Sequence, residues 1–105
     1  MIEAPLKLLL IYMDDADMWQ DLPLHEGLLR RFRQLKISGA TVTKGAMGLG
    51  SHHKVHHKGL FGMSEEHPIV ISVVENEILL RAALPEVRLM APKALMVLVD
   101  VEVVP

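Results

Sequence analysis

The chain has 105 residues, half of them apolar, a formal net charge of −2 with its six histidines counted as neutral, and no cysteine. This length fits a single domain, residues 1–105, built around one core. The near-neutral charge indicates neither a nucleic acid nor a membrane surface as partner, and the lack of cysteine excludes disulfides and thiolate metal sites.

The first predicted element is a strand over Leu6–Met13, which is apolar on both faces apart from Lys7. A strand of this kind belongs in the middle of a sheet. The run is too short to span a bilayer and is followed by an acidic loop, 14–21, so neither a signal peptide nor a transmembrane helix fits. We therefore expect a cytoplasmic protein that is not embedded in a membrane.

A helix is predicted next, because Asp21 and Pro23 form a start signal and Glu26 lies in the first turn, where the helix dipole favours a carboxylate. We expect Trp19, in the preceding loop, to cover an end of this helix. Gly39 is the predicted stop. The apolar positions with helical spacing are Leu24, Leu28, Leu29, Phe32 and Leu35.

Beyond Gly39, the sequence predicts three more strands and another helix. A strand over Ala40–Met47 is followed by a long loop, a strand over Ile69–Val74, a helix, and a final strand over Ala94–Val104. Asn76 is the predicted cap of the helix, and Pro85 is expected to kink or split it. Its expected inward residues are Ile78, Leu79, Ala82, Ala83, Val87 and Met90.

The order βαββαβ predicts an α+β, ferredoxin-like fold with a four-stranded antiparallel sheet and two helices on one face. Two helices cover only one face of such a sheet. The strands nevertheless carry more apolar residues than one face uses, so we expect the helix-free faces to pack together in an oligomer.

The loop of about 48–67 is much longer than the roughly 2–5 residues that a hairpin turn needs. It begins with Gly48 and Gly50, shortly after Gly45, and contains His52, His53, His56 and His57. Loops of this length inside compact domains are usually functional or disordered. We expect this loop to make the functional contacts.

The histidines leave two interpretations open. Pairs four residues apart share a face of a helix and are able to chelate a divalent cation, with His52 and His56 as the core pair and His53 and His57 as further ligands. Lys54 and Lys58, however, repel cations, and the alternative is a solvated loop that responds to pH.

Several motifs, taken in order, resemble the PII signalling proteins, and most closely a PII-like family catalogued only as a domain of unknown function. These motifs are Pro23-Leu24-His25-Glu26, Gly39-Ala40-Thr41-Val42, Gly48-Leu49-Gly50, Val55-His56, Ser64, Pro68 and Val101-Glu102-Val103. The resemblance covers nearly the whole chain. It implies a homotrimer that binds adenine nucleotides between subunits and signals through a long effector loop.

Residue by residue, the resemblance implies that Thr41 contacts the base, that Gly48 and Gly50 let the loop backbone approach the phosphates, and that Lys93 contacts a phosphate. Gly45 is expected to belong to the same cleft, and none of the three glycines is expected to have a packing role. The arginines that PII proteins carry near the chain end have no counterpart in 101–105. Fewer cations favour AMP, ADP or a cyclic nucleotide over ATP.

The leading hypothesis is therefore a regulator that requires no cofactor, binds AMP or ADP as effector, and signals to an unidentified protein, for which a membrane transporter is one candidate. The alternative is a divalent-metal-binding or tolerance protein that uses the histidines. An enzyme is not expected, because the sequence offers no nucleophile–base pair and no paired carboxylates.

Overall fold

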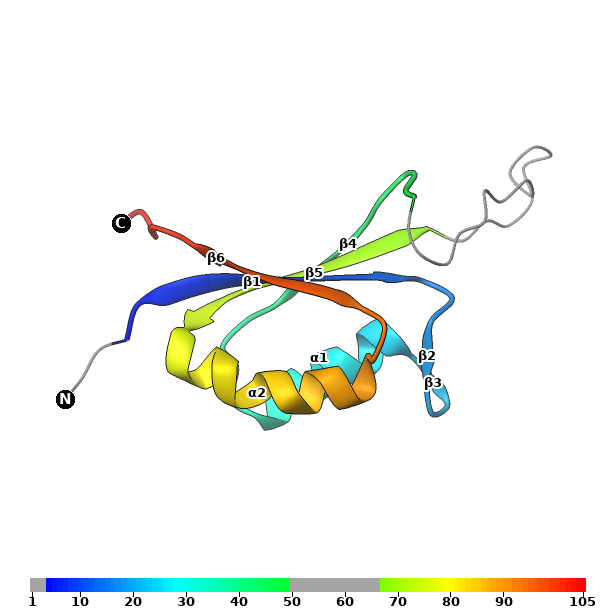
Figure 1. Ribbon diagram of the computed structural model, residues 1–105, viewed down its shortest axis with the longest axis horizontal. Helices are drawn as coiled ribbons and strands as arrows, with labels where there is room; N and C mark the ends of the chain where they lie inside the picture. Colours follow the sequence, from blue (N-terminus) through cyan, green and yellow to red (C-terminus); the bar gives the residue numbers. More distant parts are fainter. Residues whose placement is uncertain (1–3, 50–66) are drawn as a thin grey trace.

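The computed structural model describes residues 4–49 and 67–105 (Figure 1). The elements, in chain order, are β1 (Leu6–Asp14), β2 (Met18–Trp19), β3 (Leu22–Pro23), α1 (Leu24–Gln34), β4 (Thr41–Lys44), β5 (Pro68–Asn76), α2 (Glu77–Met90) and β6 (Leu95–Asp100).

Four strands form one sheet in the order β4-β5-β1-β6, and each neighbouring pair is antiparallel. The two central strands are β1, which was predicted to be central because it is apolar on both faces, and β5. Both helices lie on the same face of the sheet (Figure 1). The predicted α+β ferredoxin-like fold is confirmed.

The core lies between the sheet and the two helices. Alternate residues of the central strands point into it, since side chains of a strand alternate between faces. The buried strand residues are Leu9, Ile11 and Met13 of β1, and Ile69, Ile71 and Val73 of β5. The helices contribute Leu24, Leu28, Phe32, Leu80, Ala83, Val87 and Met90.

The acidic segment after β1 differs from the expected open loop, because it contains a short hairpin of β2 and β3. The hairpin folds Trp19 against α1, as expected. A Cβ atom added to Gly27 would lie only 2.9 Å from Cε3 of the Trp19 ring, so the helix needs a glycine there for the indole to pack closely. Gln20, in the turn between the strands, has a positive φ of 55°.

The end of α1 lies earlier than predicted. Lys36, and not Gly39, adopts the left-handed conformation that closes the helix, with φ 67°. The N–H of Ile37 donates to the carbonyl of Phe32 at 3.0 Å, and the N–H of Lys36 donates to that of Arg33 at 3.1 Å. This pair of bonds is the Schellman arrangement.

In α2, the predicted cap is confirmed: the side chain of Asn76 accepts hydrogen bonds from the N–H groups of Ile78 and Leu79. Pro85 does not split the helix, which runs as one element from Glu77 to Met90. The expected inward face was partly wrong. Ile78 is 63% exposed, Ala82 is also exposed, and Leu80 is fully buried, because the core-facing positions follow the spacing of Leu80, Ala83, Val87 and Met90.

Two strands, β4 and β6, are shorter than predicted, because each ends where its pairing with the neighbouring strand ends. β4 ends at Lys44, after which Gly45 bends toward Pro68. β6 ends at Asp100, which pairs with Lys7, the second residue of β1. Beyond this pair, β1 has almost no residues left with which the chain after Asp100 could pair.

Candidate functional site

The two segments that flank the loop lie side by side at one end of the sheet. Lys44 of β4 is opposite Ile69 of β5, and the N–H of Gly45 donates to the carbonyl oxygen of Pro68 at 2.8 Å. The chain therefore leaves the sheet after Gly45 and re-enters it at Pro68 at nearly the same point (Figure 1).

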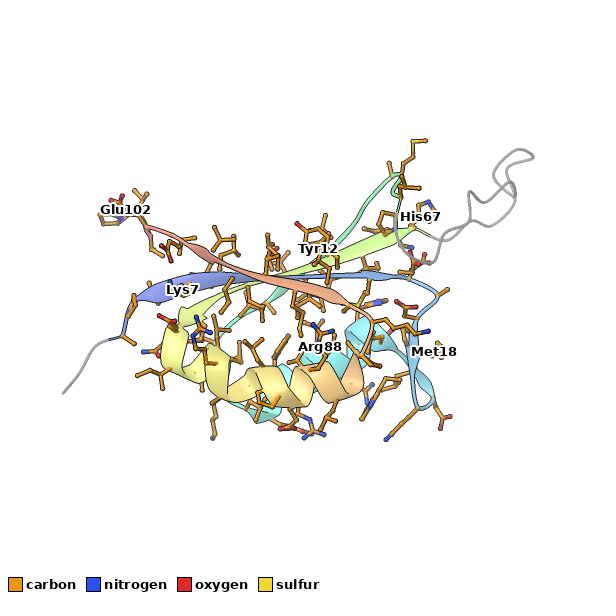
Figure 2. The ribbon with its side chains drawn as sticks, in the orientation of Figure 1. Lys7, Tyr12, Met18, His67, Arg88 and Glu102 are labelled. Carbon is orange, nitrogen blue, oxygen red and sulfur yellow. The ribbon has the colours of Figure 1, made fainter. Side chains whose placement is uncertain are left out.

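Asp15 connects both flanks to the end of β1. Its Oδ1 accepts the N–H of His67 at 3.1 Å, and its own N–H donates to the His67 carbonyl oxygen at 2.9 Å. Its Oδ2 is 3.6 Å from Lys44 Nζ and 3.6 Å from His67 Nδ1. One carboxylate thus faces a side chain from each flank, and Figure 2 shows His67 where β5 begins.

Sequence reasoning missed Asp15, which it placed in a surface loop with Asp14 and Asp17. The signal that identifies it is the strand register: Asp14, the last residue of β1, pairs with Pro68, so the residue that follows the strand lies beside His67. Such pairing of distant segments is not visible in the local pattern of a sequence.

Gly45 and Gly48 do have a packing role, contrary to expectation. A Cβ on Gly45 would lie 2.8 Å from Cγ of Pro68, and one on Gly48 would lie 3.0 Å from the same atom. The first distance is shorter than real contacts allow, and the second is at their limit. Both glycines are therefore explained by the close approach of the Pro68 ring.

Within one chain, the residues assigned to the nucleotide are far apart. Thr41 is exposed on edge strand β4, opposite Ser72, whereas Lys93 is exposed in the turn before the other edge strand, β6. The structure does not bring these two residues together in a single copy. Gly50 and the histidines His52, His53, His56 and His57 lie outside the described residues.

The face of the sheet opposite the helices carries exposed apolar side chains. Figure 2 shows Tyr12 on this face, pointing away from α1 and α2. The large apolar side chains that are 40% or more exposed on the three adjacent strands are Leu6, Tyr12, Val74, Leu95 and Val99. Thr41 belongs to the same face, because its neighbours Ala40 and Val42 pack on the core.

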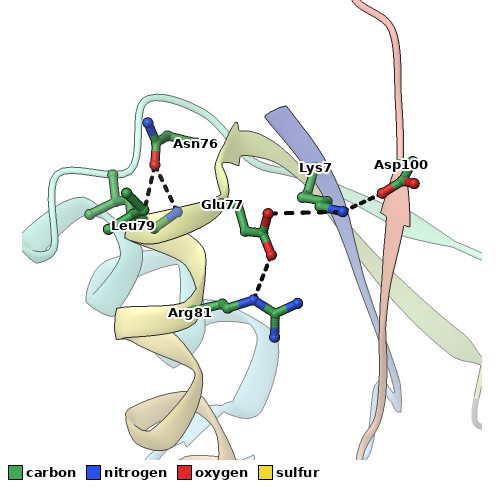
Figure 3. Close-up of polar contacts among 7 residues, drawn as sticks. Lys7, Asn76, Glu77, Leu79, Arg81 and Asp100 are labelled. Atoms are coloured by element: carbon green, nitrogen blue, oxygen red, sulfur yellow. Dashed lines mark hydrogen bonds and ion pairs between the residues drawn. The ribbon is translucent and has the colours of Figure 1, made fainter. Parts of the chain in front are cut away.

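An ion-pair network lies at the other end of β1 (Figure 3). Lys7 donates a hydrogen bond to Asp100 of β6 and lies 3.9 Å from Glu77 of α2, which also pairs with Arg81 at 2.7 Å. The hydrogen bond between Lys7 and Asp100 raises the pKa of the lysine and lowers the pKa of the carboxyl. Lying away from the loop, this network ties the edge strand β6 and α2 to the central strand.

Among residues 4–49 and 67–105, no group of three or more histidine, aspartate or glutamate side chains is placed to hold a metal ion. In the same part of the chain, neither helix is long and apolar enough to cross a bilayer.

Comparison with known proteins gives matches that cover almost the whole chain. Residues 6–103 match the model of the DUF190 family, described as "Uncharacterized ACR, COG1993". A UPF0166 protein of Aquifex aeolicus (strain VF5) is 28% identical over 98 residues, which are 93% of this chain and 92% of that protein.

Proposed function

The chain belongs to the DUF190 family, the PII-like branch that its motifs resemble, and on this basis we propose that it is a PII-like regulatory protein. As a homotrimer, it binds an adenine nucleotide with one or two phosphates in the clefts between subunits. Binding changes the conformation of loop 48–67, which then engages a partner protein, with a membrane transporter as one candidate.

The observation that carries this proposal is the placement of Thr41 and Lys93 on opposite edges of the sheet. Residues so placed serve one ligand only when the β4 edge of one copy meets the β6 edge of another. The exposed apolar side chains of the helix-free face supply the driving force for such an assembly, since burying a single leucine or valine contributes about 1.5–3 kcal/mol.

Each residue then has a role that suits its chemistry. The Thr41 hydroxyl is both a donor and an acceptor, which suits the edge of a base. The Lys93 ammonium of a neighbouring copy makes a charge-assisted contact with a phosphate. The segment after Gly45 provides backbone N–H groups beside the cleft.

The flanks of the loop explain how binding at the cleft reaches a partner. Lys44 and His67 both lie within 3.6 Å of the Asp15 carboxylate, and Gly45 is bonded to Pro68. A nucleotide that contacts the segment after β4 therefore binds next to the place where both ends of the loop are held to the sheet. Contacts made there favour one conformation of the loop over others.

Calorimetry with AMP, ADP, ATP and cyclic AMP at millimolar concentration tests the proposal. We expect AMP or ADP to bind, and Lys93→Ala to weaken binding by about 1.5–3 kcal/mol. Thr41→Val should weaken binding as well, whereas Thr43→Val, on the same face of the same strand, serves as the matched control and should not. The proposal fails if none of the four nucleotides binds.

A further inference from the structure

An arginine of α2 holds the turn that carries Lys93. Arg88 lies in the last turn of the helix (Figure 2). Its Nη1 donates to the carbonyl oxygen of Ala94 at 2.8 Å, and to those of Ala91 and Pro92 at 3.2 Å each. Three carbonyl groups from four consecutive residues thus converge on one nitrogen.

The turn has one backbone hydrogen bond of its own, from the N–H of Ala94 to the carbonyl of Ala91 at 3.2 Å. Pro92 and Lys93 are its two central residues. Among the described non-glycine residues only Gln20 and Lys36 have a positive φ, so Lys93 has the negative φ of a type I corner. Carbonyl dipoles that converge repel one another, and the guanidinium charge offsets that repulsion.

We propose that Arg88 is a positioning residue for Lys93. By holding the carbonyl groups on both sides of Lys93, it fixes the backbone from which the lysine reaches a phosphate in the neighbouring cleft. This inference rests on the proposed function and adds to it a residue that acts on the phosphates only through Lys93. If Arg88 only stabilised the helix C-terminus, its substitution would lower the stability of the protein. It would not weaken binding of the phosphates more than binding of the adenosine part.

The test compares ADP with adenosine, which lacks the phosphates, in calorimetry on Arg88→Met, Lys93→Ala and the double variant. We expect Lys93→Ala to weaken ADP binding about tenfold to a hundredfold and Arg88→Met to weaken it on the order of tenfold, and we expect both to leave adenosine binding unchanged. The double variant should bind ADP no more weakly than Lys93→Ala alone, because without the lysine there is nothing for Arg88 to position.

Two controls separate positioning from charge and from stability. Arg81→Met removes a positive charge from the same helix without touching the turn, so ADP affinity should stay unchanged. Arg88→Lys keeps the charge and the hydrogen-bond donors, and it should restore most of the ADP affinity. It also provides a folded variant if Arg88→Met fails to fold.

A second measurement needs no nucleotide. Hydrogen exchange of the Ala94 amide, followed by mass spectrometry on a peptide covering 91–95, should be faster in Arg88→Met than in the unmodified chain. Unchanged exchange overturns the role of Arg88 in holding the turn, whether or not nucleotides bind. Additive losses of ADP affinity in the double variant, or an equal loss for adenosine, overturn its action through Lys93. If the unmodified chain binds neither ligand, it is the proposed function that fails.

Discussion

Lys36 is a single residue whose backbone conformation determines how α1 ends. It has φ 67°, a region that costs a residue with a Cβ roughly 1 kcal/mol and costs glycine nothing. We predict that Lys36→Gly raises the free energy of unfolding by about 0.5–1 kcal/mol, measured by urea denaturation. Lys36→Ala keeps the Cβ and should give no such gain. An equal gain in both variants would contradict this explanation.

Glu75 is the residue whose protonation is expected to affect stability. Its pKa is lowered from the ordinary 4.5, first by the hydrogen bond from the Ser38 N–H, with the Asn76 N–H and the Ser38 hydroxyl adding to it. The two bonds from Ser38 join the segment after α1 to the end of β5. Because the folded-state pKa is the lower one, the stabilisation is complete above 4.5 and is lost as the pH falls through the folded-state value.

We therefore predict that Glu75→Gln lowers the free energy of unfolding by about 1 kcal/mol at pH 6 and flattens its dependence on pH between 6 and 3. Urea denaturation at a series of pH values measures this. Glu102→Gln, an exposed glutamate beyond β6, is the matched control and should leave the pH profile unchanged. A profile as steep in Glu75→Gln as in the unmodified chain would rule out Glu75 as its source.

At the scale of elements, the junction of β4 and β5 depends on the contact between Gly45 and the Pro68 ring. Gly45→Ala places a Cβ 2.8 Å from Cγ of that ring, which is rigid, so the strands must separate. We predict a loss of about 1–3 kcal/mol in the free energy of unfolding, and recovery of most of it in the double variant Gly45→Ala with Pro68→Ala. Gly39→Ala is the control, since a Cβ at Gly39 meets nothing within 4 Å.

Local patterns predicted the elements well where one face of each is buried. The central strands and α1 follow directly from apolar spacing, and Asn76 caps α2 as its side-chain chemistry predicts. The inward face of α2 was partly wrong, because apolar residues also lie on its exposed side: Ile78 and Ala82 were expected to face the core, and Leu80 was not.

The candidate site was less predictable, because it depends on segments that are distant in the sequence. Asp15 meets His67, 52 residues away, only through the register of β1 and β5. The packing of Gly45 and Gly48 on Pro68 likewise depends on the pairing of two strands. The sequence identified the glycines as unusual, but their spacing alone does not show what approaches them.

For the whole molecule, we expect the helix-free face of the sheet to determine the assembly. Leu10 and Val97 are directly opposite each other, on the side of β1 and β6 away from the core residues Leu9 and Leu98. We predict that Leu10→Asp prevents assembly and yields monomeric or insoluble protein, because a carboxylate would be buried without a partner. Size-exclusion chromatography with light scattering measures the mass of the particle.

Ile78→Asp is the control for this prediction. Ile78 is 63% exposed on α2, away from the sheet face, and its substitution should leave the assembly intact. A stable, soluble monomer formed by the unmodified chain would contradict both the predicted trimer and the site shared between subunits.

The strand order also has a consequence for how the protein is made. β1 is synthesised well before its two neighbours, β5 and β6, which follow it by more than half of the chain. At about 5–20 residues per second, its apolar residues wait several seconds on the ribosome before any partner strand emerges. During that time, the segment that later occupies the centre of the sheet resembles an aggregation-prone peptide. We expect the nascent chain to need a chaperone at its first strand, and the completed protein to need none.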